Sequence, residues 1–287
     1  MTILEVIQRS TDFLAQKGVS SPRLQVEHLL AHVLQMPRMK LYLNFERALT
    51  PEQLDSVRAL VRRRGRREPL QYIVGSAAFC SLELAVNPEV LVPRPETELL
   101  AERAWKFLKE SSALNSAPPA AVDLGTGSGC LAIALAVNVP QAAIHATDAS
   151  AGALALAREN AAQHHADIQF HHGDLFAALP PSSCFRLIVS NPPYIPTARI
   201  ETLEPEVRNH EPRQALDGGA DGLDFYRRIA AEGGAFLEPG GRLMLELDDE
   251  GPEAAAEIFR QQNWIVEPIE CDYNERSRIL IARLRPG

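Results

Sequence analysis

The sequence predicts an α/β protein in which a helical bundle and a β-hairpin linker precede a larger domain with a mostly parallel sheet. Up to about residue 70, short helices follow one another without strand-like alternation. From about Arg94, apolar strands alternate with helices, which is typical of a parallel sheet covered on both faces. Residues 1–78 hold 12 of the 29 Lys and Arg and 7 of the 37 Asp and Glu, a net +5, which leaves 17 against 30, or −13, for the rest.

The bundle, residues 1–75, is predicted from its helix starts. Thr2-Ile3-Leu4-Glu5 fits a capping box, in which the Thr hydroxyl and the Glu carboxylate accept from free amides at a helix start. Ser21-Pro22 and Thr50-Pro51 each place a capping hydroxyl before a proline, which needs no amide donor at the first helical position. The arginine-rich run 62–67 is either a solvated helix face or part of a basic module that meets an acidic partner.

The linker, residues 76–93, and the second domain, residues 94–287, follow. Residues 78–92 alternate like strands with Asn87-Pro88 as the turn, which predicts a hairpin. A helix over 96–109 is expected to end in a loop over 111–119. Strands are then predicted at 121–124, 143–147, 168–171, 187–190, 241–247 and 279–284, and helices at 130–137, 152–164, 223–236 and 253–262.

Composition narrows the class of protein. No stretch approaches the roughly 20 apolar residues of a membrane helix, and no basic segment leads into an apolar run at the start, so we expect a cytoplasmic protein. The total charge of −8 argues against a protein that coats nucleic acid. The cysteines lie far apart without metal spacing, so no metal site is predicted; reduced thiols are expected, at least three of them in the core. They are Cys80, Cys130, Cys184 and Cys271.

The end of the first strand carries the first candidate binding site. The segment is Asp123-Leu124-Gly125-Thr126-Gly127-Ser128-Gly129, and it runs straight into a helix. Its glycines permit a tight turn and let a ligand press against bare backbone. The spacing lacks the two-residue gap of a pyrophosphate-binding turn, and Asp123 would repel phosphate but tolerate a sulfonium and an ammonium. The turn therefore favours S-adenosylmethionine (SAM) over a dinucleotide.

Acidic residues end the next two strands. Asp148 can accept from both ribose hydroxyls, and charge-assisted bonds of this sort contribute on the order of 1.5–3 kcal/mol each. The alternative is that Asp148 caps the helix from Ser150. After the third strand, Asp174 can accept from an adenine amino group, and Leu175 or Phe176 can pack against its ring. Taken alone, Asp174 is equally an ordinary turn residue.

The fourth strand ends in Asn191-Pro192-Pro193-Tyr194. Neither proline has an amide hydrogen, so the turn offers acceptors, namely the Asn191 side-chain oxygen and the Pro192 carbonyl, and few donors. Such a turn can grip both hydrogens of an incoming NH2 group while its nitrogen faces a methyl donor. We therefore predict methylation of a planar amide or amine nitrogen, with Asn191, Pro192 and Tyr194 as catalytic residues and Pro193 as part of the substrate site. A purely structural turn is the alternative.

The chemistry explains why this grip is needed. The lone pair of an amide or arylamine nitrogen is delocalised, and two acceptors on its hydrogens favour a more pyramidal nitrogen in the transition state. In-line positioning can supply about 7–11 kcal/mol in well-oriented systems, so no dedicated base is required. The ring of Tyr194 is expected to stack on the planar group.

With these motifs the sequence resembles the HemK/PrmC family of release factor glutamine methyltransferases. The resemblance covers nearly the whole chain. Beyond the two turns it includes Glu68-Pro69-Leu70-Gln71-Tyr72-Ile73, Leu91-Val92-Pro93-Arg94-Pro95-Glu96-Thr97-Glu98, His210-Glu211-Pro212 and Gly219-Ala220-Asp221-Gly222-Leu223. The sequence departs from the family pattern at 247–251, where a glycine and a glutamine are usual after Glu246, and at 272–276, which lacks a usual glycine.

The resemblance implies N5-methylation of the glutamine in the Gly-Gly-Gln motif of bacterial peptide chain release factors. It also implies a Rossmann-like, seven-stranded methyltransferase domain and a helical substrate-recognition domain over 1–75. Carried over by motif, Gly125 to Gly129, Asp148, Leu175 and Asn191 would touch SAM, and Asn191 to Tyr194 would hold the glutamine.

Three other functions stay open. Methylation of a ribosomal protein glutamine would use the same turn. An adenine-N6 DNA methyltransferase also acts on a planar NH2, but it needs a duplex-binding insert, and the second domain is acidic, so no direct nucleic-acid binding is expected. A non-catalytic SAM sensor would not need Asn191 or Tyr194.

Overall fold

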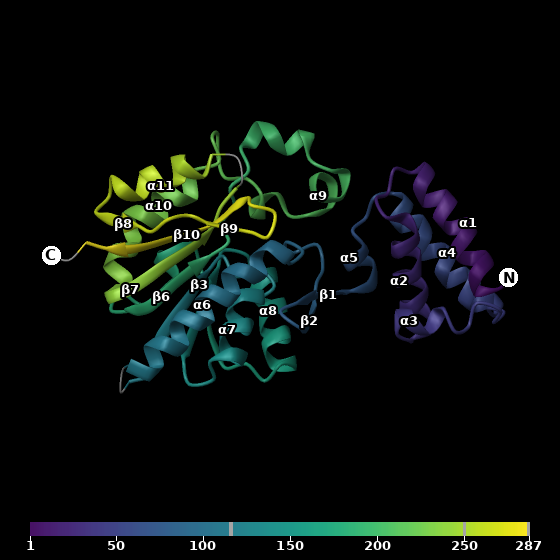
Figure 1. The fold of residues 1–287 in the computed structure, drawn as a ribbon, viewed down its shortest axis with the longest axis horizontal. Helices are drawn as coiled ribbons and strands as arrows, with labels where there is room; N and C mark the ends of the chain where they lie inside the picture. Colours follow the sequence, from purple (N-terminus) through teal and green to yellow (C-terminus); the bar gives the residue numbers. More distant parts are fainter. Residues whose placement is uncertain (115–116, 249–250, 286–287) are drawn as a thin grey trace. The chain divides into compact units, whose positions relative to one another are not determined.

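The computed structural model of the protein describes residues 1–114, 117–248 and 251–285. It forms two compact units (Figure 1). The first contains Met1–Ser76 together with Glu204–His210, and the second contains Ala77–Leu203 and Glu211–Gly287. Two features of this division differ from the organisation expected from the sequence. The hairpin belongs with the second unit from Ala77 onward, and a segment from the middle of the second domain belongs with the first unit.

The first unit is helical, as expected. Its helices are α1 (Ile3–Gln16), α2 (Pro22–Leu34), α3 (Arg38–Leu41), α4 (Pro51–Gly65), α5 (Leu70–Val74) and α9 (Pro205–His210). The capping box of Thr2 with Glu5 is confirmed, and Thr50 forms a second one with Gln53. The cap predicted at Ser21 is wrong: this residue has a φ of 47° and its side chain makes no capping bond.

Ion pairs tie α9 to the arginine-rich end of α4. The Arg64 side chain is only 3% exposed, and its Nη2 donates to Glu206 Oε1 at 2.6 Å. Arg67 Nε donates to the same oxygen at 2.6 Å, and its Nη2 reaches Glu204 Oε2 at 2.8 Å. At these two positions the arginine-rich run is therefore not a solvated face, because both guanidinium groups are committed to carboxylates within the unit.

The second unit is built on an open sheet. Its strands are β3 (Ala120–Leu124), β4 (Ala143–Asp148), β5 (Ile168–His172), β6 (Phe185–Ser190), β7 (Leu237–Glu246), β8 (Trp264–Val266), β9 (Glu270–Cys271) and β10 (Ser277–Leu284). They lie in the order β5-β4-β3-β6-β7-β10-β8, with β9 beside β10. The pairs β5-β4, β4-β3, β3-β6 and β6-β7 are parallel, and β10 is antiparallel to its neighbours. The predicted α/β class and the seven-strand path are confirmed.

Helices cover both faces of this sheet (Figure 1). On one face lie α6 (Pro95–Leu114), α7 (Cys130–Asn138) and α8 (Ala151–Gln163), and on the other lie α10 (Asp224–Glu232) and α11 (Pro252–Arg260). Alternate side chains feed the two cores: Leu187 packs with the first group and Ile188 with the second, and both are fully buried. Strand order reverses between β3 and β6, where such sheets bind ligands at their carboxyl edge.

Several local expectations are corrected. The hairpin pairs β1 (Ser76–Phe79) with β2 (Leu82–Ala85), so its turn is Cys80-Ser81 and Asn87-Pro88 follows it. Helix α6 extends to Leu114, beyond the predicted end at 109. None of the four cysteines is buried, and Cys184 and Cys271 are exposed.

The two departures from the family pattern are partly visible. Leu247 is buried and Asp248 accepts from Arg199 at 3.1 Å, while residues 249–250 lie outside the described residues. Near the end, Asp272 accepts from the amides of Asn274 and Arg276 at 2.8 and 3.0 Å. Glu275 has a φ of 61°, so the loop takes a left-handed residue without a glycine.

Two features are absent from the described residues. No helix among them combines the length and the apolar character needed to cross a bilayer. Over the same residues, no group of three or more His, Cys, Asp or Glu side chains is arranged to hold a metal ion.

Candidate active site

The turn after β3 exposes backbone to a cavity. Gly125 and Gly127 have φ values of 71° and 55°, and a Cβ added at either would meet no atom within 4 Å in the part of the chain that the structure describes. Gly129 differs, because a Cβ there would lie 3.0 Å from Ile133 Cδ1 and 3.2 Å from Ala157 Cβ. The first two glycines therefore leave open space for a ligand, and the third lets α7 and α8 approach closely.

Asp148, at the end of β4, is held by the backbone. Its Oδ2 accepts from the Gly127 amide and its Oδ1 from the Ser150 amide, each at 2.8 Å. It does not cap α8, because Ser150 itself accepts from Ala153 at 3.1 Å. Asp148 lines the cavity, and each of its carboxylate oxygens can accept a further hydrogen bond.

Asp123 lies behind the turn. It is 1% exposed and does not line the cavity, and its Oδ2 accepts from Thr126 Oγ1 at 2.6 Å and from the Ala132 amide at 3.3 Å. Within the described residues its Oδ1 has no partner. Burial, reinforced by the charge of Asp148, raises the pKa of Asp123 to about 7. Its effect on a ligand is electrostatic, through the turn.

The end of β5 contributes Asp174 and Leu175, and both line the cavity. Asp174 Oδ2 accepts from Arg228 at 2.8 Å and is largely exposed, so one oxygen stays available. Leu175 has a φ of 47° and is 6% exposed, while the neighbouring Phe176 packs in the core. Of the two ring-packing candidates named from the sequence, Leu175 is the one that lines the cavity.

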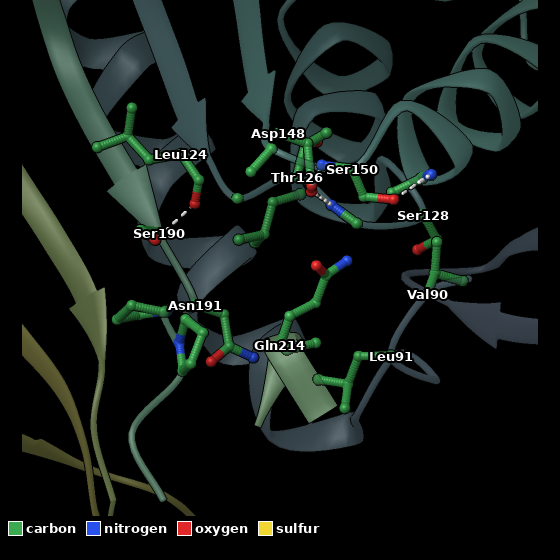
Figure 2. Close-up of a pocket in the computed structure, with 18 of the residues that line it drawn as sticks. Val90, Leu91, Leu124, Thr126, Ser128, Asp148, Ser150, Ser190, Asn191 and Gln214 are labelled. Atoms are coloured by element: carbon green, nitrogen blue, oxygen red, sulfur yellow. Dashed lines mark hydrogen bonds between the residues drawn. The ribbon is translucent and has the colours of Figure 1, made fainter. Parts of the chain in front are cut away.

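The cavity joins the turns after β3, β4, β5 and β6 and has a volume of about 320 Å³. Figure 2 shows Asn191 after β6 on the side of the cavity opposite Asp148 and Ser150, and Gln214 reaching toward its centre. All the predicted cofactor residues except Gly129 line it, as do Pro192 and Pro193. Ser190, at the end of β6, donates to the Leu124 carbonyl at 2.6 Å and holds the two strand ends together.

Tyr194 occupies a different position. It is absent from the cavity lining and faces a smaller pocket lined also by Arg199 and Tyr226. Its hydroxyl lies 3.3 Å from Glu246 Oε1, and burial raises the pKa of this phenol far above its usual range. The stacking partner predicted for a planar substrate is therefore turned toward Glu246 in this structure.

A glycine-rich loop supports the Asn191–Tyr194 turn from behind. A Cβ on Gly218 would lie 2.8 Å from both the Pro193 carbonyl oxygen and Tyr194 Cα, and one on Gly222 would meet the Tyr194 carbonyl oxygen. The Ile195 amide donates to Leu216 O at 3.0 Å, so the segments pair as a short bridge. Glycine is required here by close backbone approach.

Sequence reasoning did not identify several residues from outside the sheet that line the cavity or support it from behind. Arg94 Nη2 donates to both carboxylate oxygens of Glu211, at 2.7 and 2.6 Å, although 117 residues separate them. Asn160 of α8 exchanges bonds of 2.7 and 3.0 Å with the Ala85 backbone and donates to Ser128 O at 2.9 Å. Other lining residues without an assigned role are Val90, Leu91, Pro93, Thr97, Gln214, Phe225 and Arg228.

Comparisons with known proteins identify the two domains and the fold. Residues 106–203 match the methyltransferase small domain family, and residues 5–75 match the PrmC N-terminal domain family. A solved methyltransferase from Pyrococcus furiosus, 20% identical, shares the fold with a TM-score of 0.53 over 77% of this chain and 97% of its own. The fold and the matched domain together define an enzyme of the methyltransferase class.

Closer relatives identify the family. A release factor glutamine methyltransferase from Geobacter sulfurreducens is 50% identical over 99% of this chain and 97% of its own. One from Chlorobaculum tepidum is 40% identical over 96% and 95%. The chain belongs to the release factor glutamine methyltransferase family, and the resemblance noted from its motifs is confirmed.

Proposed function

We propose that this protein transfers a methyl group from SAM to the side-chain amide nitrogen of the glutamine in the Gly-Gly-Gln motif of peptide chain release factors. The observation that carries the proposal is the shared cavity: the Asn191-Pro192 turn, rich in acceptors, faces the same space as Gly125, Gly127 and Asp148. The names of the full-length relatives support the substrate.

The residues around the cavity fit the cofactor. Gly125 and Gly127 give it bare backbone, and Asp148 and Asp174 offer carboxylate oxygens at the positions proposed for the ribose and the adenine. Leu175 provides an apolar wall. When bound, SAM supplies a methyl group activated by a sulfonium. Above its pKa of about 7, the buried carboxylate of Asp123 favours a cationic ligand over a phosphate.

The protein's part of the chemistry is to hold the glutamine. The Asn191 side-chain oxygen and the Pro192 carbonyl accept the two amide hydrogens, which leaves the nitrogen directed into the cavity. These bonds strengthen as the nitrogen becomes pyramidal, so they stabilise the transition state more than the ground state. The methylated nitrogen then loses a proton to water, and no side chain needs to act as a base before attack.

We further propose that the first unit recognises the release factor. Met39 and Leu43 are 65% and 84% exposed, and large apolar side chains at such exposure often mark contact surfaces. The net charge of this region is positive, unlike that of the rest of the chain. Replacing both residues with serine should raise the KM for the release factor without changing SAM affinity.

The decisive experiment supplies SAM with a labelled methyl group together with a release factor, a ribosomal protein fraction and DNA in separate reactions. Label is expected on the release factor glutamine, located by mass spectrometry. Asn191→Ala should lower the rate by about 100-fold or more, within the range that single transition-state contacts provide, while SAM still binds. Label in ribosomal protein or DNA would overturn the substrate, and full activity of Asn191→Ala would overturn the mechanism.

A further inference from the structure

A chain of side chains behind the cavity links Asn191 to a buried acid. Asn191 Nδ2 lies 3.1 Å from Thr97 Oγ1, at the start of α6, and Thr97 Oγ1 lies 2.6 Å from Glu246 Oε2, at the end of β7. The other Glu246 oxygen lies 3.3 Å from the Tyr194 hydroxyl. Glu246 is 2% exposed and Thr97 is 2% exposed, so water does not compete for these bonds.

The direction of these bonds follows from the donors available. A carboxylate only accepts, so the single hydroxyl hydrogen of Thr97 is donated in a hydrogen bond to Glu246. The Thr97 oxygen then has only lone pairs to offer and requires a donor. Of the two ends of the Asn191 amide, only the NH2 group can donate, which leaves the amide oxygen for the cavity.

We propose that Glu246 and Thr97 are positioning residues that hold the Asn191 side-chain amide with its oxygen toward the cavity. This inference rests on the proposed function, because an oxygen in that place is what an incoming glutamine NH2 requires. The same carboxylate anchors Tyr194, so one buried acid orients both ends of the Asn191–Tyr194 turn. Tyr226 adds a bond from its hydroxyl to the Glu246 carbonyl at 2.8 Å.

Protonation of Glu246 would remove the constraint. A neutral carboxyl can donate to Thr97, whose hydroxyl is then free to donate to the Asn191 oxygen, so the amide can turn over. Burial raises the pKa of Glu246 to about 7, with Thr97 and Tyr194 opposing the rise through hydrogen bonds. The ionisable groups that interact with it are Glu96, Cys130, Tyr194, Tyr226 and Arg278, of which Arg278 lowers its pKa and Glu96 raises it.

Kinetics of matched variants test the proposal. At pH 8, Thr97→Val and Glu246→Gln should each lower kcat by about tenfold or more, with the Kd for SAM and the KM for the release factor within about twofold of wild type. Thr97→Ser keeps the hydroxyl and should stay within about threefold. Thr202→Val is the control, because its hydroxyl donates to a backbone carbonyl away from the cavity. The wild-type kcat should rise with pH through about 7, whereas that of Thr97→Val should be flat.

A second measurement does not depend on the substrate. In protein labelled with 15N-asparagine, the Asn191 NH2 signal, identified by its loss in Asn191→Ser, should exchange slowly in wild type and quickly in Thr97→Val. A Thr97→Val kcat within twofold of wild type, or a parallel loss of SAM affinity, would overturn the positioning role. If no release factor is methylated, the proposed function fails. The positioning role is tested separately, because equal Asn191 NH2 exchange rates in wild type and Thr97→Val would refute the hydrogen bond between Asn191 and Thr97.

Discussion

Gly222 packs against the carbonyl oxygen of Tyr194 so closely that the position has no room for a Cβ, and its φ of 80° is one that side chains rarely adopt. Gly222→Ala should therefore destabilise the protein by about 2 kcal/mol or more and displace the Asn191–Tyr194 turn. Thermal unfolding and the methylation rate measure the two effects.

Gly251→Ala is the matched control. Its φ is 91°, but no atom of the described residues lies within 4 Å of the Cβ it would gain, so the substitution brings backbone strain without a collision among them. The difference between the two variants isolates the close approach, and equal losses would show that the approach is unimportant.

Asp148→Asn should weaken SAM binding. Two backbone amides already donate to this side chain, one to each oxygen, so an NH2 group in place of one oxygen faces a donor and can no longer accept from a ribose hydroxyl. A loss of about 1.5–3 kcal/mol corresponds to roughly 10- to 150-fold in Kd, which calorimetry resolves. Asp167→Asn, at an exposed position before β5, should bind normally. Equal affinity of wild type and Asp148→Asn would remove Asp148 from the cofactor site.

Stability should depend on pH through Asp123. Its pKa in the folded protein is about 7, above its ordinary value of 3.8, so the folded state holds a proton that the unfolded state releases. The contribution of this group is therefore fully present below about pH 3.8 and is lost as pH rises through 7.

Comparing the melting temperatures of wild type and Asp123→Asn removes the pH dependence that other titratable groups contribute. Between pH 5 and pH 8 the melting temperature of wild type should fall relative to that of Asp123→Asn, which has no proton to lose. A constant difference between the two curves would mean that Asp123 does not titrate in this interval.

Arg94→Met should be more damaging than its exposure suggests. The Arg94 side chain is 32% exposed, but that of its partner Glu211 is 1% exposed, so removing the guanidinium leaves a buried carboxylate without its cation. We expect a loss of about 2–3 kcal/mol in the free energy of unfolding. Adding Glu211→Gln should restore part of it, and strictly additive losses would argue against a direct pair.

The sequence was sufficient for those parts of the site that follow a strand. The glycine turn, Asp148, Asp174 and Asn191 each lie at or just beyond the end of a strand, and parallel strands bring their carboxyl ends to one edge. At their carboxyl ends β4 and β5 extend one residue beyond the predicted ranges and β7 ends one residue earlier, so the motifs still lie at the same edge of the sheet.

Residues that support the site through contacts distant in sequence show no comparable sequence pattern. Thr97 is one hydroxyl at a helix start, 149 residues from the Glu246 that it contacts, and no local pattern reports a contact at that separation. The only local hint at Glu246 is an acid that ends a buried strand. The motif predicts that the Tyr194 ring stacks on the substrate, whereas in the structure its hydroxyl lies 3.3 Å from Glu246 Oε1.

The hairpin turn was missed for a different reason. Cys80 and Ser81 both have positive φ, at 48° and 66°, where glycine or asparagine is usual, so the residues carried no turn signal while Asn87-Pro88 did. Ser21 failed as a cap because the residue itself is left-handed and its hydroxyl cannot reach the helix amides.

The segment Glu204–His210 belongs to the first unit but is synthesised long after the other helices of that unit. When the ribosome has made the first 76 residues, the bundle still lacks Glu206, which lies 142 residues beyond Arg64 in the chain. Until that carboxylate emerges, a nearly buried guanidinium is without its acid, and the N-terminal helices cannot reach their final stability ahead of the rest. A unit whose helices are mostly made early is thus completed only by a segment made much later.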